Sequence, residues 1–235
     1  MISAQYASDR KTVASHVKAA GGLTAVHSGV TAALRTPDVR NAWSALYVGM
    51  ITDVAGEFAR ASQEEIASYD DDIDLTDDDE LDAGVSKYAA GYTDDRVDDM
   101  LNATANLINR RFDRDILAGL TLAELLSELD DIYSELEDTG ADALAEYEAV
   151  LAGNWGMDFG AFSLDVSLEK TWYAVLDERT REWHAEMDGT TIPNDEAFDV
   201  DGEQMMYPMD DSLGATGRYI YGCRCVSGYI PTSSA

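Results

Sequence analysis

Apolar residues recur at the spacing of α-helices through the first 150 residues. The clearest run follows Thr36 and Pro37, which suit an N-cap and the first position of a helix. A weaker amphipathic segment, from about Ser8 to Leu34, precedes it. The clear run predicts one apolar stripe on a helix of about 25 residues. That stripe comprises Trp43, Leu46, Tyr47, Met50, Ile51, Val54 and Phe58.

Three more helices are predicted downstream. One begins near Thr93, and its apolar positions repeat every three or four residues. Another begins at Thr121, where a glutamate three positions later completes a capping box. A last helix over residues 141–162 is expected to be interrupted at Gly153 and Gly156. These stripes favour a bundle core, with a stripe that faces a partner subunit as the alternative.

Residues 64–92 differ from the helical segments around them, because a long part of this stretch consists almost entirely of aspartate and glutamate. We expect a solvated loop or a short frayed helix here. Asp72, Asp74 and Thr76 have the alternating spacing of calcium ligands, but Asp77 stands where an EF-hand loop needs glycine. Loose, unspecific association of cations is therefore the better interpretation.

After about residue 163 the apolar period shortens to that of a strand, starting around Trp172. Asp177 then suits the cap of a short helix that Gly189 ends. A loop and hairpin are expected over residues 190–207, and a last strand from Arg218 to Ile230.

The predicted fold class is therefore α+β. A helical region over residues 1–150, suited to docking or oligomerisation, precedes a small C-terminal lobe over residues 151–235. That lobe is expected to hold strands, a short helix and a hairpin.

Composition points to an unusual solvent. The chain has 46 Asp and Glu against 16 Lys and Arg, for a formal net charge of −30, and only four of the basic residues are lysines. At ~1 M salt the Debye length is about 3 Å, so this self-repulsion is tolerable there and costly in dilute buffer. The sequence predicts adaptation to high salt, as in a halophilic host; an ordinary acidic protein or a DNA mimic is the alternative.

Several classes of protein are disfavoured. No apolar run is long enough to predict a transmembrane helix, and the N-terminus lacks the features of a secretory signal, so no membrane partner is expected. No basic stripe for DNA is present, although molar salt weakens that objection. The glycines from Gly214 to Gly217 lack the rest of a phosphate loop.

The two cysteines lie in one Cys-x-Cys, and on the predicted last strand Cys223 and Cys225 share a face. A disulfide between such neighbours is awkward, whereas two thiolates can bind one metal. The functional interpretation is Zn²⁺ held by His184, Cys223 and Cys225, with the fourth ligand open among three carboxylates: Asp177, Asp188 and Asp210. Inert buried thiols with a hydrogen-bonded histidine, or a redox pair, are the alternatives.

A dense polar group precedes His184. Arg179 can pair with a carboxylate such as Asp177 or Asp210 and so fix the short helix against the hairpin. A relay of thiol, imidazole and Asp177 carboxylate is the catalytic alternative. No residue pattern around either cysteine supports that alternative.

The C-terminal motif as a whole has a specific order. It comprises Trp172, Asp177-x-Arg179-Thr180, His184, Asp188-Gly189, Phe198, Tyr207-Pro208, Asp210 and Cys223-x-Cys225. This order, over about residues 140–230, resembles the Mu F-like phage head morphogenesis family of minor head proteins. The upstream match is Asn154 and the stretch from Glu146 to Glu148, which lacks the family's arginine and threonine. Gly222 stands in place of the asparagine usual before Cys-x-Cys.

The resemblance implies a minor capsid protein of a tailed virus and no enzymatic activity. Implied partners are the portal protein, the major capsid protein and, in some members, genomic DNA, with several copies around the portal vertex. The implied location is the capsid interior or portal vertex, and the host cytoplasm during assembly. A metal-dependent hydrolase or nuclease, acting when the genome is packaged or when the virus enters its host, is the alternative. A cellular acidic protein with a prophage-derived domain is a third.

Overall fold

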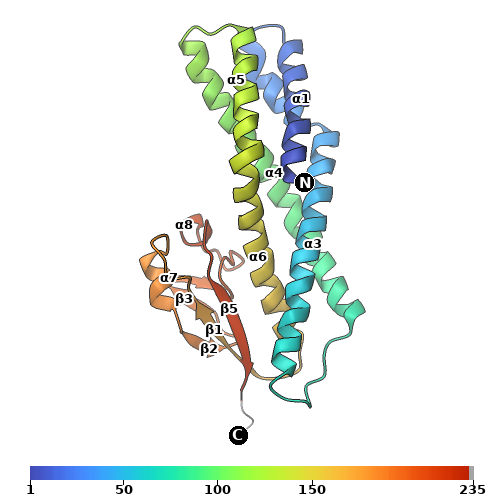
Figure 1. The fold of residues 1–235 in the computed structure, drawn as a ribbon, viewed down its shortest axis with the longest axis vertical. Helices are drawn as coiled ribbons and strands as arrows, with labels where there is room; N and C mark the ends of the chain where they lie inside the picture. The colour runs from blue at the N-terminus through green and yellow to red at the C-terminus, as the bar shows by residue number, and fades with distance from the viewer. Residues whose placement is uncertain (233–235) are drawn as a thin grey trace. The chain divides into compact units, whose positions relative to one another are not determined.

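The computed structural model describes residues 1–232 and has an α+β fold, as predicted (Figure 1). The helical elements of the first 162 residues are α1 (Ile2–Ala19), η1 (Leu23–Ala25), α2 (Val26–Leu34), α3 (Pro37–Ala67), α4 (Asp78–Leu117), α5 (Leu122–Glu135), the π-helical segment η2 (Leu136–Gly140) and α6 (Ala141–Phe162). The remaining elements are β1 (Leu168–Tyr173), α7 (Glu182–Met187), β2 (Thr191–Pro193), β3 (Phe198–Val200), β4 (Glu203–Met205), α8 (Gly217–Ile220) and β5 (Val226–Pro231).

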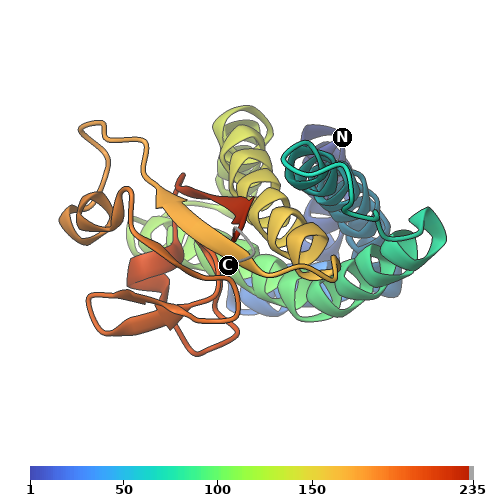
Figure 2. The same cartoon turned by 90° about the horizontal axis from the view of Figure 1, so that it is seen from below.

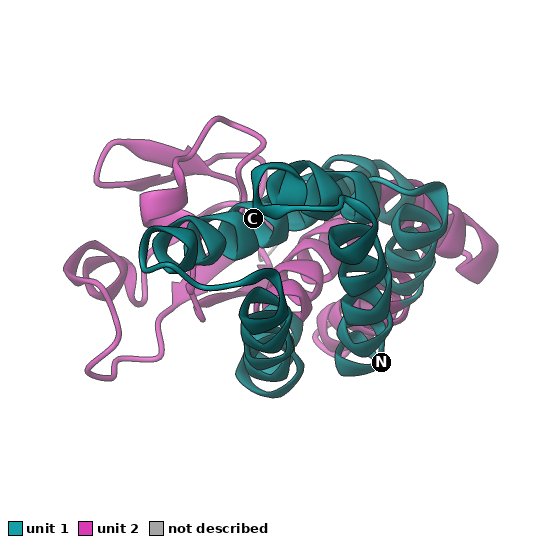
Figure 3. Ribbon diagram, turned by 90° about the horizontal axis from the view of Figure 1, so that it is seen from above, with its two compact units in different colours: residues 1–49, 89–145 teal, residues 50–88, 146–235 magenta. Residues whose placement is uncertain are grey.

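The chain divides into two compact units that interleave along the sequence (Figure 3). Unit 1 combines residues 1–49 with 89–145, and unit 2 combines residues 50–88 with 146–235. The boundary expected at residue 150 lies inside α6. Unit 2 therefore contains not only the C-terminal lobe but also the second half of α3 and the first part of α4.

Unit 1 is a helical bundle whose core surrounds Trp43. Tyr6 and Tyr47 lie beside this ring, with centroids 5.0 Å and 6.2 Å from it. The indole N–H donates to the Asp9 carboxylate over 2.6 Å, and Gln5 donates to the same carboxylate over 2.8 Å. Asp9 is almost fully buried, and this burial raises its pKa to about 6.

The helix predicted from Pro37 begins there but runs further than expected, to Ala67. The hydroxyl of Thr36, the residue before α3, donates back to the Ala33 carbonyl over 3.0 Å. Burial along α3 moves from large to small side chains. Phe58, the last member of the predicted stripe, is 42% exposed, while Ala55 and Ala59 are fully buried.

Close packing in unit 2 explains that shift. A Cβ on Gly156 or Gly160 would collide with the backbone of Ala55 or Ala59 respectively, so α6 lies directly against the main chain of α3. The glycines of α6 were expected to interrupt the helix, and this prediction was wrong. At Gly156 and Gly160 the neighbouring backbone leaves no room for a side chain, so glycine at these two positions serves helix packing and does not break the helix.

The acidic run is more ordered than predicted. Helix α4 begins at Asp78 and not near Thr93, and the backbone N–H of Asp79 donates to the Asp77 side chain over 2.9 Å. Carboxylates in the first turn of a helix are stabilised by its macrodipole and by its free N–H groups. The prediction at Thr121 is confirmed, because the capping box with Glu124 is present in both directions.

The C-terminal lobe contains a three-stranded antiparallel sheet in the order β2-β1-β5 and a separate β3–β4 hairpin. Along β1, Leu168, Lys170 and Trp172 are buried, and they alternate with more exposed residues. The hairpin turns at Asp201 and Gly202, which both have positive φ, as a two-residue hairpin loop of the right twist requires. The expected loop and hairpin are therefore confirmed.

The predicted final strand was wrong in its first half. Residues 217–220 form α8, and strand β5 begins only at Val226. Gly222 adopts a left-handed conformation with φ of +67°, which turns the chain between the helix and the strand. No helix within the described residues 1–232 has the combination of length and apolarity needed to span a membrane.

Candidate metal centre

Two elements of the lobe bring three metal-ligand side chains together. His184 lies on α7, and Cys223 and Cys225 lie in the extended segment between α8 and β5. All three are buried, with exposures of 2%, 4% and 3%. Their ligand atoms lie within 4.8 Å of one another, and no other such group occurs in residues 1–232. This buried group can hold a metal ion.

The distances suit tetrahedral coordination. The His184 Nδ1 and the Cys225 Sγ are 3.6 Å apart. Zinc–sulfur bonds of about 2.3 Å and zinc–nitrogen bonds of about 2.0–2.1 Å place such atoms about 3.6 Å apart at a tetrahedral angle. The Cys225 backbone N–H also points toward the Cys223 Sγ, at 3.4 Å, so the segment folds around its own sulfurs.

The two cysteine thiols shift each other's pKa in opposite directions. The Cys223 thiol, followed by His184, stabilises the Cys225 thiolate and lowers the pKa of Cys225 to about 5, although burial opposes the shift. The pKa of Cys223 is raised because its thiol donates to Cys225 and is itself buried. Cys225 is thus held in the thiolate form, which is the form that binds metals.

Little free space adjoins these atoms. The cavity beside the three side chains measures about 10 Å³, and its rim includes Arg179, Arg181 and Arg224. A space of about this size holds one water molecule or one ion. The free space beside the centre is therefore small.

None of the three carboxylates expected to complete the coordination joins the group. The Asp177 carboxylate binds Arg224, and Asp188 accepts the backbone N–H of Ala174 over 2.9 Å. Asp210 accepts the backbone N–H groups of Met206 and Ser212 over 2.8 and 2.9 Å. The candidate centre thus has three protein ligands and no fourth among the described residues.

The sequence suggested that Arg179 pairs with Asp177. In the structure the arginine that pairs with Asp177 is Arg224. Arg224 makes a bidentate contact of 2.8 and 2.6 Å, which holds the pKa of Asp177 below its usual range. Arg179 and Thr180 instead contribute to a turn that the Asp177 side chain closes. Because Asp177 is committed to this pair, the relay of thiol, imidazole and carboxylate lacks its third member.

Other motif residues connect β1 with α7. Trp172 is fully buried and meets the His184 ring edge-to-face at 5.6 Å. The carbonyl of Trp172 accepts the N–H of Gly189 over 2.8 Å, and Gly189 has the positive φ of a helix-ending glycine. Together with Asp188, these residues fix the position of His184 relative to the sheet.

Sequence reasoning missed the residues that hold the lobe from inside. Lys170 has no exposed surface, and its ammonium donates to the Met206 carbonyl over 2.7 Å. Burial lowers its pKa, an effect that Asp158 and Asp210 oppose. The Asn154 side chain on α6 donates to the Cys225 carbonyl over 3.0 Å. Only the match to the motif marked Asn154, and nothing in the sequence indicated its contact.

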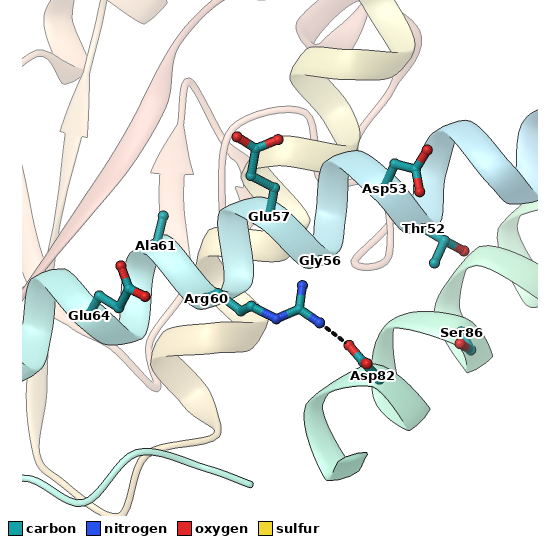
Figure 4. A pocket seen from close by; sticks show the side chains of 9 residues that line it. All are labelled: Thr52, Asp53, Gly56, Glu57, Arg60, Ala61, Glu64, Asp82 and Ser86. Carbon is teal, nitrogen blue, oxygen red and sulfur yellow. Dashed lines mark hydrogen bonds and ion pairs between the residues drawn. The ribbon is translucent and has the colours of Figure 1, made fainter. Parts of the chain in front are cut away.

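A second cavity in unit 2 has a different character. It measures about 660 Å³, is open to solvent, and lies along α3 and the start of α4 (Figure 4). Acidic side chains dominate its lining, and Arg60 is ion-paired with Asp82. Its lining contains no histidine or cysteine, so it offers no soft metal ligand.

Comparison with protein-family models, with curated proteins and with solved structures gave no match. Function is therefore inferred from the residues and their geometry.

Proposed function

We propose that this chain is a minor capsid protein of a tailed virus, and that its C-terminal lobe is an architectural module fastened by a metal ion. The observation that carries the proposal is the closed His184–Cys223–Cys225 centre. Its donors are buried, and the adjoining space of about 10 Å³ admits no substrate. A site of this kind can join segments of chain together but has no access for catalysis.

The roles of the motif residues support this interpretation. Trp172 packs on His184, Gly189 ends α7, and Asp177 binds Arg224. Each contact joins one segment of the lobe to another. The resemblance to phage minor head proteins rests on these same residues, and it supplies the viral part of the proposal. The portal protein or the major capsid protein is the proposed partner, with several copies around the portal vertex.

The proposed ion is Zn²⁺. Two thiolates and an imidazole are the ligands that zinc prefers, and the separation of 3.6 Å between Nδ1 and Sγ fits its tetrahedral geometry. A bound zinc would crosslink α7 to the segment before β5. Such a crosslink would add to the apolar core of a small lobe whose strands are short.

Three protein ligands also occur in catalytic zinc sites, where a water takes the fourth position. Hydrolase or nuclease activity would require a substrate to reach that position. The cavity of about 10 Å³ accommodates about one water, and its rim provides no carboxylate to act as a general base. The architectural role is therefore favoured.

Quantitative mass spectrometry of purified virions tests the proposal. We expect the chain in every particle, at a low and constant ratio to the portal protein. Absence from particles, together with turnover of a nucleic-acid or peptide substrate that chelation abolishes, would reverse the assignment.

Metal analysis tests zinc separately. Protein purified in high salt should contain about one zinc per chain, and the variant Cys223→Ser should lose it. Zinc far below stoichiometry in the unmodified protein, with melting unchanged in Cys223→Ser, would exclude the metal but not the capsid role.

A further inference from the structure

One buried amide connects helix α6 to the candidate metal centre. Asn154 is 2% exposed, and its Nδ2 donates to the carbonyl of Cys225 over 3.0 Å. Strand β5 lies alongside α6 in two perpendicular views (Figures 1 and 2), and Tyr229 of β5 also donates to Asp158 of α6 over 3.0 Å. The asparagine therefore reaches the Cys-x-Cys segment from a rigid element.

The Cys225 carbonyl lies just outside the sheet. The ladder between β1 and β5 ends at the pair of Tyr173 and Val226, one residue after Cys225. A buried carbonyl at that position needs a hydrogen-bond donor from elsewhere in the fold. Asn154 supplies the donor at the point where the strand pairing stops.

This contact fixes the orientation of the cysteine. The direction of a carbonyl sets the peptide plane that follows the residue, and so restrains how the residue presents its side chain. The Cys225 Sγ then lies 3.6 Å from the His184 Nδ1, while the Cys225 N–H meets the Cys223 Sγ. The Asn154 amide thus restrains Cys225, and Cys225 contacts both of the other proposed ligands, His184 and Cys223.

The two links to this segment that involve arginine lie at the surface. The Arg224–Asp177 ion pair and the contact from Arg181 to the Tyr221 carbonyl are both exposed. Molar salt screens exposed ion pairs strongly, whereas a buried, neutral hydrogen bond is unaffected. In the solvent that the composition indicates, Asn154 is the most dependable restraint on the cysteines.

The other end of the same amide is unsatisfied. The Asn154 Oδ1 is buried and has no hydrogen-bond partner among the described residues. An apolar side chain of similar size would remove this unpaired oxygen, but it would leave the buried Cys225 carbonyl without its donor. Only the donor half of the amide is in use, and it serves the Cys225 carbonyl.

We propose that Asn154 is a positioning residue of the metal centre, which holds Cys225 in the conformation that binds the ion. This inference rests on the proposed zinc site. It assigns to helix α6 a direct role in metal affinity, although α6 contributes no ligand.

The test compares zinc affinity, measured by chelator competition on the full chain, in the unmodified protein and in Asn154→Leu. We expect the variant to bind zinc about 10- to 100-fold more weakly. Its cobalt-substituted form should lose the intense visible bands of a tetrahedral site. The metal-free variant should melt somewhat lower, because the Cys225 carbonyl loses its donor, so circular dichroism first confirms that the variant is folded at the temperature of the zinc and cobalt measurements.

Asn194→Leu is the matched control, because Asn194 is also buried in the lobe with an unpaired Oδ1. It should leave zinc affinity unchanged. If Asn154→Leu does not fold, Asn154→Ala decides by the same measurements. Unchanged affinity and cobalt bands would overturn the positioning role while zinc stands. A parent protein that binds no zinc would overturn the inference together with the metal site.

Discussion

Unit 1 and the C-terminal lobe of unit 2 are stabilised in different ways. In unit 1, buried aromatic and aliphatic side chains from several helices form the core, and the Asp9 carboxylate is an isolated charge within it. In the lobe, strands of three to six residues surround the buried polar side chains of Lys170, His184 and Asp210. Long helices can rely on apolar burial, whereas a small lobe depends on specific hydrogen bonds and, as we propose, on a metal ion.

The largest expected effect concerns the whole chain and tests whether both regions share the same solvent requirement. Transfer from molar salt to ~0.1 M NaCl should loosen or unfold the protein, because the net charge of −30 is then poorly screened. Circular dichroism and melting temperature across that range are the measurements. A flat response would show that the acidic surface is no adaptation to salt.

The close contact between α6 and the backbone of α3 should tolerate no side chain at Gly160. Gly160→Val on α6 would drive a branched side chain into the Ala59 backbone and should destabilise the protein by about 3 kcal/mol in denaturant unfolding. Gly153→Ala is the matched control, because a Cβ there meets only the Phe58 ring at ordinary contact distance, 3.5 Å. Equal effects of the two variants would show that α6 lies further from α3.

A buried carboxylate in unit 1 should make stability depend on pH. The pKa of Asp9 is raised to about 6, so its favourable contribution is complete below about pH 4 and is lost as pH rises through 6. Relative to Asp9→Asn, the parent should lose about 2 kcal/mol of unfolding free energy between pH 4 and 7.

The exposed Asp95→Asn removes the same charge and serves as the control for that pH profile. It should run parallel to the parent. A parallel profile for Asp9→Asn as well would show that Asp9 titrates normally in the folded protein.

The smallest effect should come from the ion pair between Arg224 and Asp177 in the lobe. Arg224→Gln removes the pair with Asp177, which is well exposed, and should lower the melting temperature slightly in dilute buffer and not at all in molar salt. A large loss that persists in high salt would show that this arginine supports the metal centre directly.

The sequence predicted the helices better than the lobe for physical reasons. A capping box such as the one at Thr121 is local, and a stripe such as Trp43 to Ile51 repeats with the helical period, so both are visible without the fold. The extension of α4 to Asp78 was missed because its acidic residues suggested a solvated loop. In the structure these acidic residues occupy the first turn of α4, where helix capping and the macrodipole stabilise them.

The candidate site was predicted only in part. Residue types and proximity identified His184, Cys223 and Cys225, and the structure brings these three together. The supporting residues were not predictable, because Asn154 and Arg224 act through contacts 71 and 47 residues away in sequence. The assumption that Cys223 lay on a strand also failed, because Gly222 turns the chain first.

The contact of Gly156 and Gly160 with the α3 backbone has a consequence for how this protein can change over time. The spacing of the two helices is set by main-chain atoms, so no exchange of larger side chains can adjust it. Selection for stability at high salt or for a new binding partner must therefore act on the outward-facing positions of both helices. The seam between them should remain the most invariant part of unit 2 across divergent descendants.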